Sequence, residues 1–156
     1  IPLCLVGSEM CIRDSLKASH PELRLLVFDG LRTRSVQKKL WDALDTIPVS
    51  LRTQFVADPK KGSIHNYGAA VDLTLALENG SELDMGTEYD HFGELAFPAL
   101  EDSLLAIGKL TVKQIENRTI LRQVMTKAGF STIDSEWWHF DAFSRNETKN
   151  KYKIVE

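Results

Sequence analysis

Hydrophobic and polar positions alternate in short stretches that predict strands. The apolar run 24–28 ends at an Asp-Gly pair, which is typical of a buried strand closed by a turn. Within 70–75 apolar and polar residues alternate, so we expect a half-buried strand with Asp72 on its polar face. Asn79-Gly80 predicts a hairpin turn after it, and the aromatic stretch 137–140 also has strand character.

Other stretches carry the spacing of amphipathic helices. Ser35 is a candidate N-cap for a helix of about ten residues that ends by Pro48. A second helix is predicted over 117–128, with Gly129 as its C-terminal cap. Residues 85–109 indicate a loop with a short helix. Because strands and helices mix without a regular βαβ period, the pattern predicts an α+β fold.

Composition narrows the class of protein without selecting a function. The chain has 156 residues, enough for one domain with a real core. Its net charge of −3 gives no general attraction to nucleic acid or anionic lipid. No apolar run reaches the roughly 18 residues that a membrane span needs. The Lys-rich tail after Phe143 is expected to be solvated.

The first fifteen residues have a different character from the rest. Residues 1–15 show neither helical nor strand period and contain both cysteines, Cys4 and Cys11. They resemble adapter-derived sequence, so we interpret 1–15 as a non-native leader and 16–156 as one N-terminally truncated domain. The domain then has no thiol for catalysis or for a disulfide. With the native start missing, cytoplasm and periplasm both stay open, as does the oligomeric state.

Two short segments contain the candidate chemistry. The first is Ser63-Ile-His65-Asn-Tyr-Gly68-Ala-Ala-Val-Asp72, and the second is Glu136-Trp-Trp-His139. Catalytic zinc commonly takes three ligands from histidine and carboxylate side chains and leaves a fourth position for water. A further carboxylate that is not a ligand can then move the proton of that water. The set predicts a Zn²⁺ site of His65, Asp72 and His139 with Glu136 as general base.

The spacing of these residues sets a geometric condition. An odd separation along a regular strand would direct Glu136 and His139 to opposite faces, so the segment must bend or turn. Gly68 can absorb a similar turn between His65 and Asp72. Taken singly, each histidine is more often a packed or surface residue than a ligand. His91 is the main rival ligand.

Together these motifs resemble a family of zinc peptidases that act on D-Ala-D-Ala. The Ser-x-His-x6-Asp pattern and the EWWHF sequence are similar to those of carboxypeptidases, endolysins and VanX-type D-alanyl-D-alanine dipeptidases. The resemblance covers about 25–140. It implies a hedgehog/DD-peptidase-like fold, in which a small antiparallel sheet is flanked by helices. It also implies one zinc ion per chain and a role in peptidoglycan metabolism.

Further matches favour the dipeptidase branch and imply individual roles. Asp29-Gly-Leu-Arg32 resembles a Gly-Tyr-Arg element whose arginine holds the oxyanion or carboxylate, which assigns that role to Arg32. Met85-Gly-Thr-Glu-Tyr-Asp90 is similar to a Met-Gly-x-x-Phe-Asp signature whose aspartate anchors the free amino group of a dipeptide. Asp90 would be that anchor, and Ser63 would help line the pocket.

Some features depart from the resemblance or leave alternatives open. Glu94-Leu-Ala-Phe97 stands where the dipeptidases carry a Glu-Arg-x-His-like stretch. A carboxypeptidase or endolysin-type enzyme would use the same zinc site, and a binding module could retain zinc for structure alone. Trp137 and Trp138 are expected in the core and pocket wall rather than on a stacking surface. The expected partner is a small dipeptide, with no nucleic acid.

Overall fold

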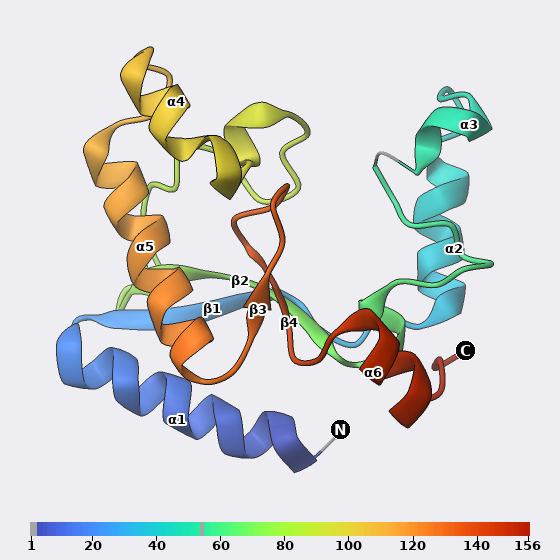
Figure 1. Ribbon diagram of the computed structural model, residues 1–156, viewed down its shortest axis with the longest axis horizontal. Coiled ribbons are helices and arrows are strands. Elements are labelled where there is room, and N and C mark those ends of the chain that lie inside the picture. Colours follow the sequence, from blue (N-terminus) through green and yellow to red (C-terminus); the bar gives the residue numbers. More distant parts are fainter. Residues whose placement is uncertain (1–2, 54) are drawn as a thin grey trace.

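The computed structural model describes residues 3–53 and 55–156, with side chains from residue 11 onward. These residues form helices on either side of one small sheet, which confirms the predicted α+β class (Figure 1). The α-helices and strands in chain order are α1 Leu3–Ser19, β1 Leu23–Asp29, α2 Arg34–Ala43, α3 Val49–Arg52, β2 Ala70–Leu77, α4 Glu101–Ala106, α5 Val112–Lys127, β3 Ser131–Thr132, β4 His139–Asp141 and α6 Arg145–Lys151. The 3-10 turns are η1 Ile64–Tyr67, η2 Glu94–Ala96 and η3 Pro98–Leu100.

The sheet has the order β1-β2-β4-β3, and every described strand pair is antiparallel. β2 is the central strand for the site because it pairs with both β1 and β4. Its register places Asp72 opposite His139 and also brings it level with Asp29 at the irregular end of β1. The hairpin predicted at Asn79-Gly80 is present, since Leu77 N–H donates to Ser81 across the turn.

The two faces of β2 have different surroundings. Its apolar face packs with α1 and α5, and Leu73, Leu75 and Leu121 are almost completely buried there. Burying such a side chain contributes about 1.5–3 kcal/mol of stability. The opposite, polar face carries Asp72. Figure 1 shows α4 and α5 on one side of the molecule and α2 and α3 on the other.

Several predicted boundaries were wrong for local reasons. The N-cap of α2 is Thr33, whose hydroxyl accepts the N–H of Val36, and not Ser35 as predicted, so the helix begins at Arg34. α5 begins at Val112, five positions before the predicted 117, because Thr111 and Gln114 form a capping box. Both caps place an oxygen acceptor at the first unpaired backbone N–H groups of a helix.

Both ends of the chain contain helices that the sequence analysis did not predict. The aperiodic stretch 1–15 contributes most of α1, in which Ile12 packs into the core; residues 1 and 2 of the predicted leader lie outside the described residues. The predicted solvated tail contains α6, whose Thr148 is fully buried. None of the described helices has the length and apolar character of a membrane span.

Candidate metal centre

His65 is positioned by a short, tightly capped turn. It lies in η1, where the Ser63 hydroxyl accepts its backbone N–H at 3.1 Å. The side-chain oxygen of Asn66 in turn accepts the backbone N–H of Ser63, which completes a capping box. Gly68 ends the turn with a left-handed φ of 64°, a conformation that glycine adopts without strain. Gly68 therefore supplies the change of direction that the spacing requires.

Sheet register brings the other two candidate ligands together. Asp72 Oδ1 lies 3.0 Å from His139 Nδ1, while Asp72 Oδ2 lies 3.3 Å from His65 Nε2. The two imidazoles approach to 3.2 Å between His65 Nε2 and His139 Nδ1. One donor atom from each of these three buried residues falls within 4.8 Å of the others, a cluster that could hold a metal ion. The three predicted ligands thus meet at one point.

The remaining nitrogen of each imidazole has a hydrogen-bond acceptor. His65 Nδ1 lies 2.9 Å from the Gly30 carbonyl, and His139 Nε2 lies 2.9 Å from Asp141 Oδ1. When each of these nitrogens donates its N–H, His65 Nε2 and His139 Nδ1 keep free lone pairs toward the centre. Acceptors of this kind orient metal-binding histidines and make them more basic.

Asp141 was missed by the sequence reasoning, although a signal was present. It stands two positions after His139, and residues two apart in a strand share a face. The same alternation that revealed Asp72 therefore points to Asp141 as a neighbour of the imidazole.

The charges of the cluster favour a cation at its centre. Burial opposes ionisation of Asp72, but hydrogen bonds from His139 and His65 outweigh it and hold the pKa of Asp72 below its usual range. Burial also opposes a charged His139, yet Asp141 and Asp72 raise the pKa of His139 to about 10. Asp72 and Asp141 therefore favour a positive charge beside them, which the imidazolium of His139 supplies.

Glu136 lies beside the cluster rather than within it. It is followed by a turn at Trp137 and Trp138 that leads into β4, which satisfies the condition that its segment bend. Glu136 Oε2 is 3.8 Å from His139 Nδ1, and 40% of the side chain is exposed. Its burial raises the pKa of Glu136, and the nearby Asp72 and Asp90 carboxylates add to the rise against the opposing effect of His139. A carboxylate whose pKa lies above its ordinary value is a stronger base, which suits a group that must accept a proton.

Arg32 reaches the same cavity from the turn after β1. Its backbone N–H donates to the His65 carbonyl at 3.1 Å, so the two residues are fixed relative to each other. Its guanidinium Nε lies 2.8 Å from Asp29 Oδ2, an orienting ion pair that sequence reasoning did not identify. The arginine is mostly buried and still lines the cavity.

Asp90 approaches from the loop that follows the hairpin. Among the described residues it is the one non-glycine position with positive φ, at 58°. Burial and the charge of Asp72 raise the pKa of Asp90, while Arg32 lowers it. Its neighbour Tyr89 donates to Asp72 at 3.2 Å and stacks on Phe28, with ring centroids 4.6 Å apart. The loop therefore touches both the predicted metal ligand and the cavity.

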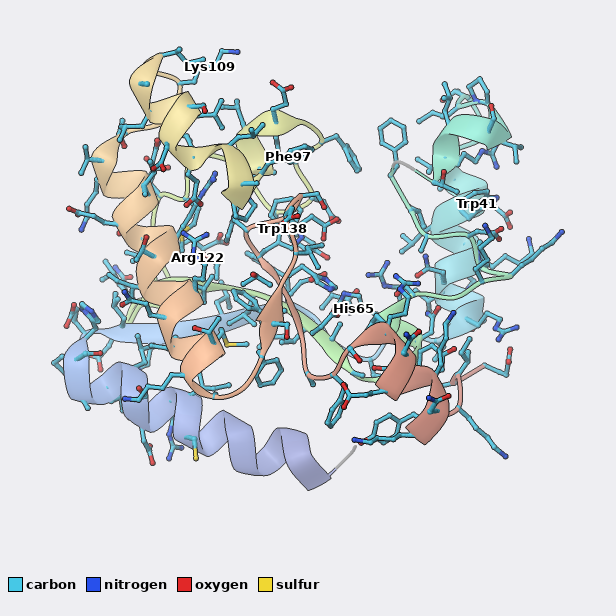
Figure 2. The ribbon with its side chains drawn as sticks, viewed as in Figure 1. Trp41, His65, Phe97, Lys109, Arg122 and Trp138 are labelled. Carbon is cyan, nitrogen blue, oxygen red and sulfur yellow. The ribbon has the colours of Figure 1, made fainter. Side chains whose placement is uncertain are left out.

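A small polar cavity of about 200 Å³ joins these residues. It is lined by every candidate site residue, namely Arg32, Ser63, His65, Asp72, Asp90, Glu136 and His139, and also by Asp141, Gln37 and Arg145. Figure 2 shows His65 near the middle of the molecule, between the sheet and helix α2. Trp137 and Trp138 are buried in the hydrophobic core, as predicted, and neither lines this cavity. His91 is outside the cluster of ligands.

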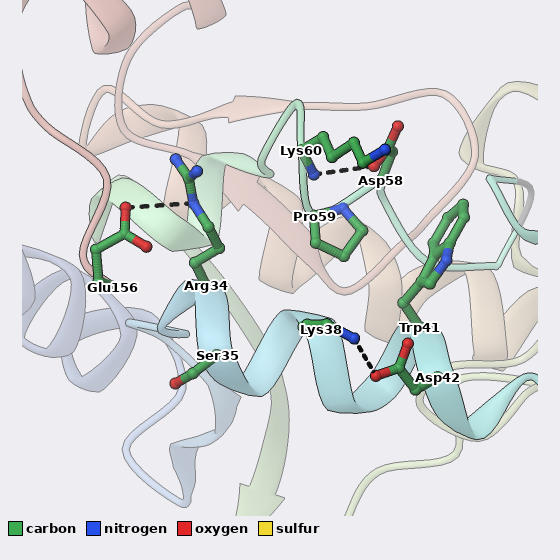
Figure 3. Close-up of a pocket in the computed structure, with 9 residues that line it drawn as sticks. All are labelled: Arg34, Ser35, Lys38, Trp41, Asp42, Asp58, Pro59, Lys60 and Glu156. Carbon is green, nitrogen blue, oxygen red and sulfur yellow. Dashed lines mark hydrogen bonds and ion pairs between the residues drawn. The ribbon is translucent and has the colours of Figure 1, made fainter.

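A larger groove of about 460 Å³ lies away from this site, between α2 and the 58–60 loop (Figure 3). Its charged groups pair locally. Lys38 Nζ meets Asp42 at 2.5 Å, and Arg34 Nε lies 3.4 Å from Glu156. No metal-binding cluster of described residues falls in it. The convergent chemistry therefore belongs to the smaller cavity.

An α+β fold with a buried His-Asp-His cluster defines a protein equipped to hold a divalent metal. A family model described as D-ala-D-ala dipeptidase matches residues 4–154, and the chain belongs to this peptidase family. The resemblance noted in the sequence is thereby confirmed.

Curated relatives agree with the family. The chain is 37% identical to D-alanyl-D-alanine dipeptidase of Escherichia coli K12 over 119 residues, covering 76% of this chain and 55% of that protein. It is 28% identical to the Synechocystis enzyme of the same name over 155 residues, covering 82% and 63%. A match to the Enterococcus faecium enzyme is 33% identical over 79 residues, covering 50% and 36%. The chain thus spans little more than half the length of the first of these relatives.

Proposed function

We propose that this protein is a zinc-dependent dipeptidase that hydrolyses D-alanyl-D-alanine or a similar small dipeptide. The observation that carries the proposal is the convergence of His65, Asp72 and His139 with Glu136 beside them. Family membership and the activity for which the relatives are named support the same substrate.

The donor set fits zinc. Two imidazole nitrogens and one carboxylate oxygen are common zinc ligands, and both imidazoles have acceptors for their second N–H. Three ligands leave room for a fourth, exchangeable position. When bound, zinc supplies Lewis acidity, which lowers the pKa of water and polarises a carbonyl oxygen. A purely structural role would leave Glu136 without a task.

Glu136 is the proposed proton carrier. Its carboxylate takes the proton of the attacking water and returns it to the amine that leaves when the peptide bond breaks. Its half-buried position raises the pKa of Glu136, so the carboxylate takes up the proton of the water more readily in the first half of the reaction. Arg32, held by Asp29, is placed to stabilise the negative charge that develops on the carbonyl oxygen.

Selection of a free dipeptide is assigned to Asp90. Its carboxylate lines the cavity and can pair with a substrate ammonium group. Ser63 contributes to the wall while it caps the turn of His65.

The test compares two substrates. Alanine release is measured from D-Ala-D-Ala and from N-acetyl-D-Ala-D-Ala with zinc-loaded protein. We expect a preference of at least tenfold in kcat/KM for the free dipeptide, because acetylation removes the charge that pairs with Asp90. Preference for the blocked substrate would assign the protein to the carboxypeptidases instead. Turnover of neither would overturn the proposal.

A further inference from the structure

Arg118 of α5 is a buried cation outside the catalytic cavity, with 1% of its surface exposed. Its Nε donates to the Met85 carbonyl at 2.7 Å, and its Nη2 donates to the Leu95 carbonyl at 2.9 Å. These two carbonyls lie on either side of Asp90 in the sequence. A single guanidinium therefore closes the segment 85–95 into a loop whose middle faces the cavity.

We propose that Arg118 is a positioning residue for substrate selection, acting through Asp90. The kinetic part of this inference rests on the proposed dipeptidase function, and the structural part does not. Arg118 touches none of the candidate metal ligands, so its effect must pass through the loop that it closes.

The surroundings of Arg118 make the closure rigid. Its charge is balanced by Glu101, whose Oε1 lies 3.4 Å from Nη1. Its guanidinium also lies 5.8 Å from the centre of the Trp137 ring, and Trp137 donates from Nε1 to Thr87 inside the loop at 2.7 Å. Because Trp137 directly follows Glu136, the same set of contacts holds both the Asp90 loop and the proposed base, Glu136, in place relative to each other.

The backbone conformation of Asp90 depends on how the loop 85–95 is held. Asp90 has a positive φ of 58°, a conformation that non-glycine residues adopt infrequently and that neighbouring structure helps to hold. With both ends of the loop held, Asp90 keeps that conformation. If the bonds to Met85 and Leu95 were lost, the residue would relax toward negative φ and its carboxylate would leave the cavity wall.

The chain offers a matched control on the same helix. Arg122 lies one turn after Arg118 and pairs with the same carboxylate, with Nη2 at 2.6 Å from Glu101 Oε2. Among the described residues, the side-chain bonds of Arg122 go to Glu101 and reach no carbonyl of the loop. Arg118→Lys removes the two-carbonyl fork, since an ammonium cannot reproduce its planar geometry. Arg122→Lys changes the same charge pair but leaves the loop closed.

Hydrogen exchange tests the structural part without activity. In Arg118→Lys, amides of residues 86–94 should exchange at least tenfold faster than in wild type, with zinc content unchanged. In Arg122→Lys, their exchange should stay within twofold of wild type. If Arg118→Lys does not fold, Arg118→Gln provides the same measurement with a smaller neutral donor. Unchanged exchange in the Arg118 variant, or equal acceleration in the Arg118 and Arg122 variants, overturns the proposal.

Kinetics test the link to Asp90. Arg118→Lys and Asp90→Asn should each lower kcat/KM for D-Ala-D-Ala by about tenfold to a hundredfold, chiefly through KM. The double variant should lose little more than Asp90→Asn alone, because both changes remove one interaction. If the loss of kcat/KM in the double variant equals the product of the two single losses, Arg118 does not act through Asp90. Absence of wild-type turnover would instead overturn the dipeptidase function, while the exchange measurement still decides the loop closure.

Discussion

Asp72 and His139 are register partners across the β2–β4 pair, with Asp72 Oδ1 3.0 Å from His139 Nδ1. Two segments that are far apart in sequence thus place their candidate ligands through backbone pairing alone. His65 is added by the turn that leads into β2, and its N–H is fixed by Ser63. Because backbone geometry sets the three donors, single side-chain changes at the cluster can remove metal binding without unfolding the sheet.

Replacing a ligand should remove the metal. His139→Ala leaves two donors in place of three, so zinc content after dialysis should fall from about one per chain to well below half. Inductively coupled plasma mass spectrometry measures this content. His91→Ala is the control, since His91 is exposed and outside the cluster, and it should keep full zinc. Full zinc in His139→Ala would exclude this residue as a ligand.

Replacing the base should separate metal binding from turnover. Glu136→Gln keeps the shape of the side chain but cannot take a proton, so kcat should fall by about 10²- to 10⁴-fold with zinc content unchanged. Steady-state kinetics on D-Ala-D-Ala measure the loss. Glu116→Gln, an exposed change on α5, should leave kcat unaltered. Turnover retained in Glu136→Gln would assign the proton transfer to another group.

The residues of the candidate site were easier to predict from the sequence than the residues that hold them in position. His65, Asp72, Glu136 and His139 were identified because metal chemistry restricts residue type and because strand alternation marked Asp72. The structure brings all four together with Arg32, Ser63 and Asp90 around one cavity. Asp29, Asp141 and Arg118 were missed because their roles depend on distances between segments, which no local pattern contains.

Some elements of the fold could also be predicted from the sequence and others could not. β1 and β2 were predictable as strands from apolar runs and alternation, but their burial differs from the prediction, because most of β1 is only partly buried and the Asp72 face of β2 is buried as well. Helix α1 was not predictable, because its residues show no periodic stripe and their helical structure accompanies packing of Ile12 and Leu16 against the sheet. Likewise α6 has a charged sequence that predicts a solvated tail, and contacts around Thr148 and Tyr152 hold it in place.

Proton release should accompany zinc binding. Burial disfavours the charged imidazole, but Asp141 and Asp72 outweigh it and raise the pKa of His139 to about 10 from an ordinary 6.5. At pH 7 His139 therefore carries a proton that zinc must displace, and apparent zinc affinity should rise with pH up to about 10. Titration calorimetry at pH 7 in two buffers of different ionisation enthalpy should give about one proton released per zinc. No release would contradict the raised pKa.

The same shift sets the pH dependence of folding under chelation. A folded-state pKa above the unfolded value contributes stability that is complete below about 6.5 and is lost as pH rises through about 10. The melting temperature of the chelated protein should accordingly fall between pH 7 and 10. Added zinc should remove most of this fall, because it replaces the lost proton.

Asp141→Asn should weaken zinc binding without removing a ligand. The amide still occupies the position 2.9 Å from His139 Nε2 but no longer carries the charge that makes the imidazole more basic. Loss of such a partner typically costs about 10- to 100-fold in metal affinity. Competition with a chromophoric chelator measures the change. Asp134→Asn, an exposed position before the turn, is the control and should leave affinity unaltered.

Gly86→Ala should destabilise the fold more than Gly80→Ala does, although both glycines have nearly the same backbone. Their φ values are 83° and 84°, so an added Cβ brings the same conformational strain at both positions. At Gly86 the new atom would also meet Leu110 Cδ2 at 2.5 Å, whereas at Gly80 nothing lies within 4 Å. We expect a loss of about 1 kcal/mol for Gly80→Ala and about 1–3 kcal/mol more for Gly86→Ala. Urea unfolding of the two variants measures the difference. Equal losses would mean that the loop at Gly86 and the Leu110 side chain move apart without cost, and the Met85-Gly86 signature would then reflect backbone conformation alone.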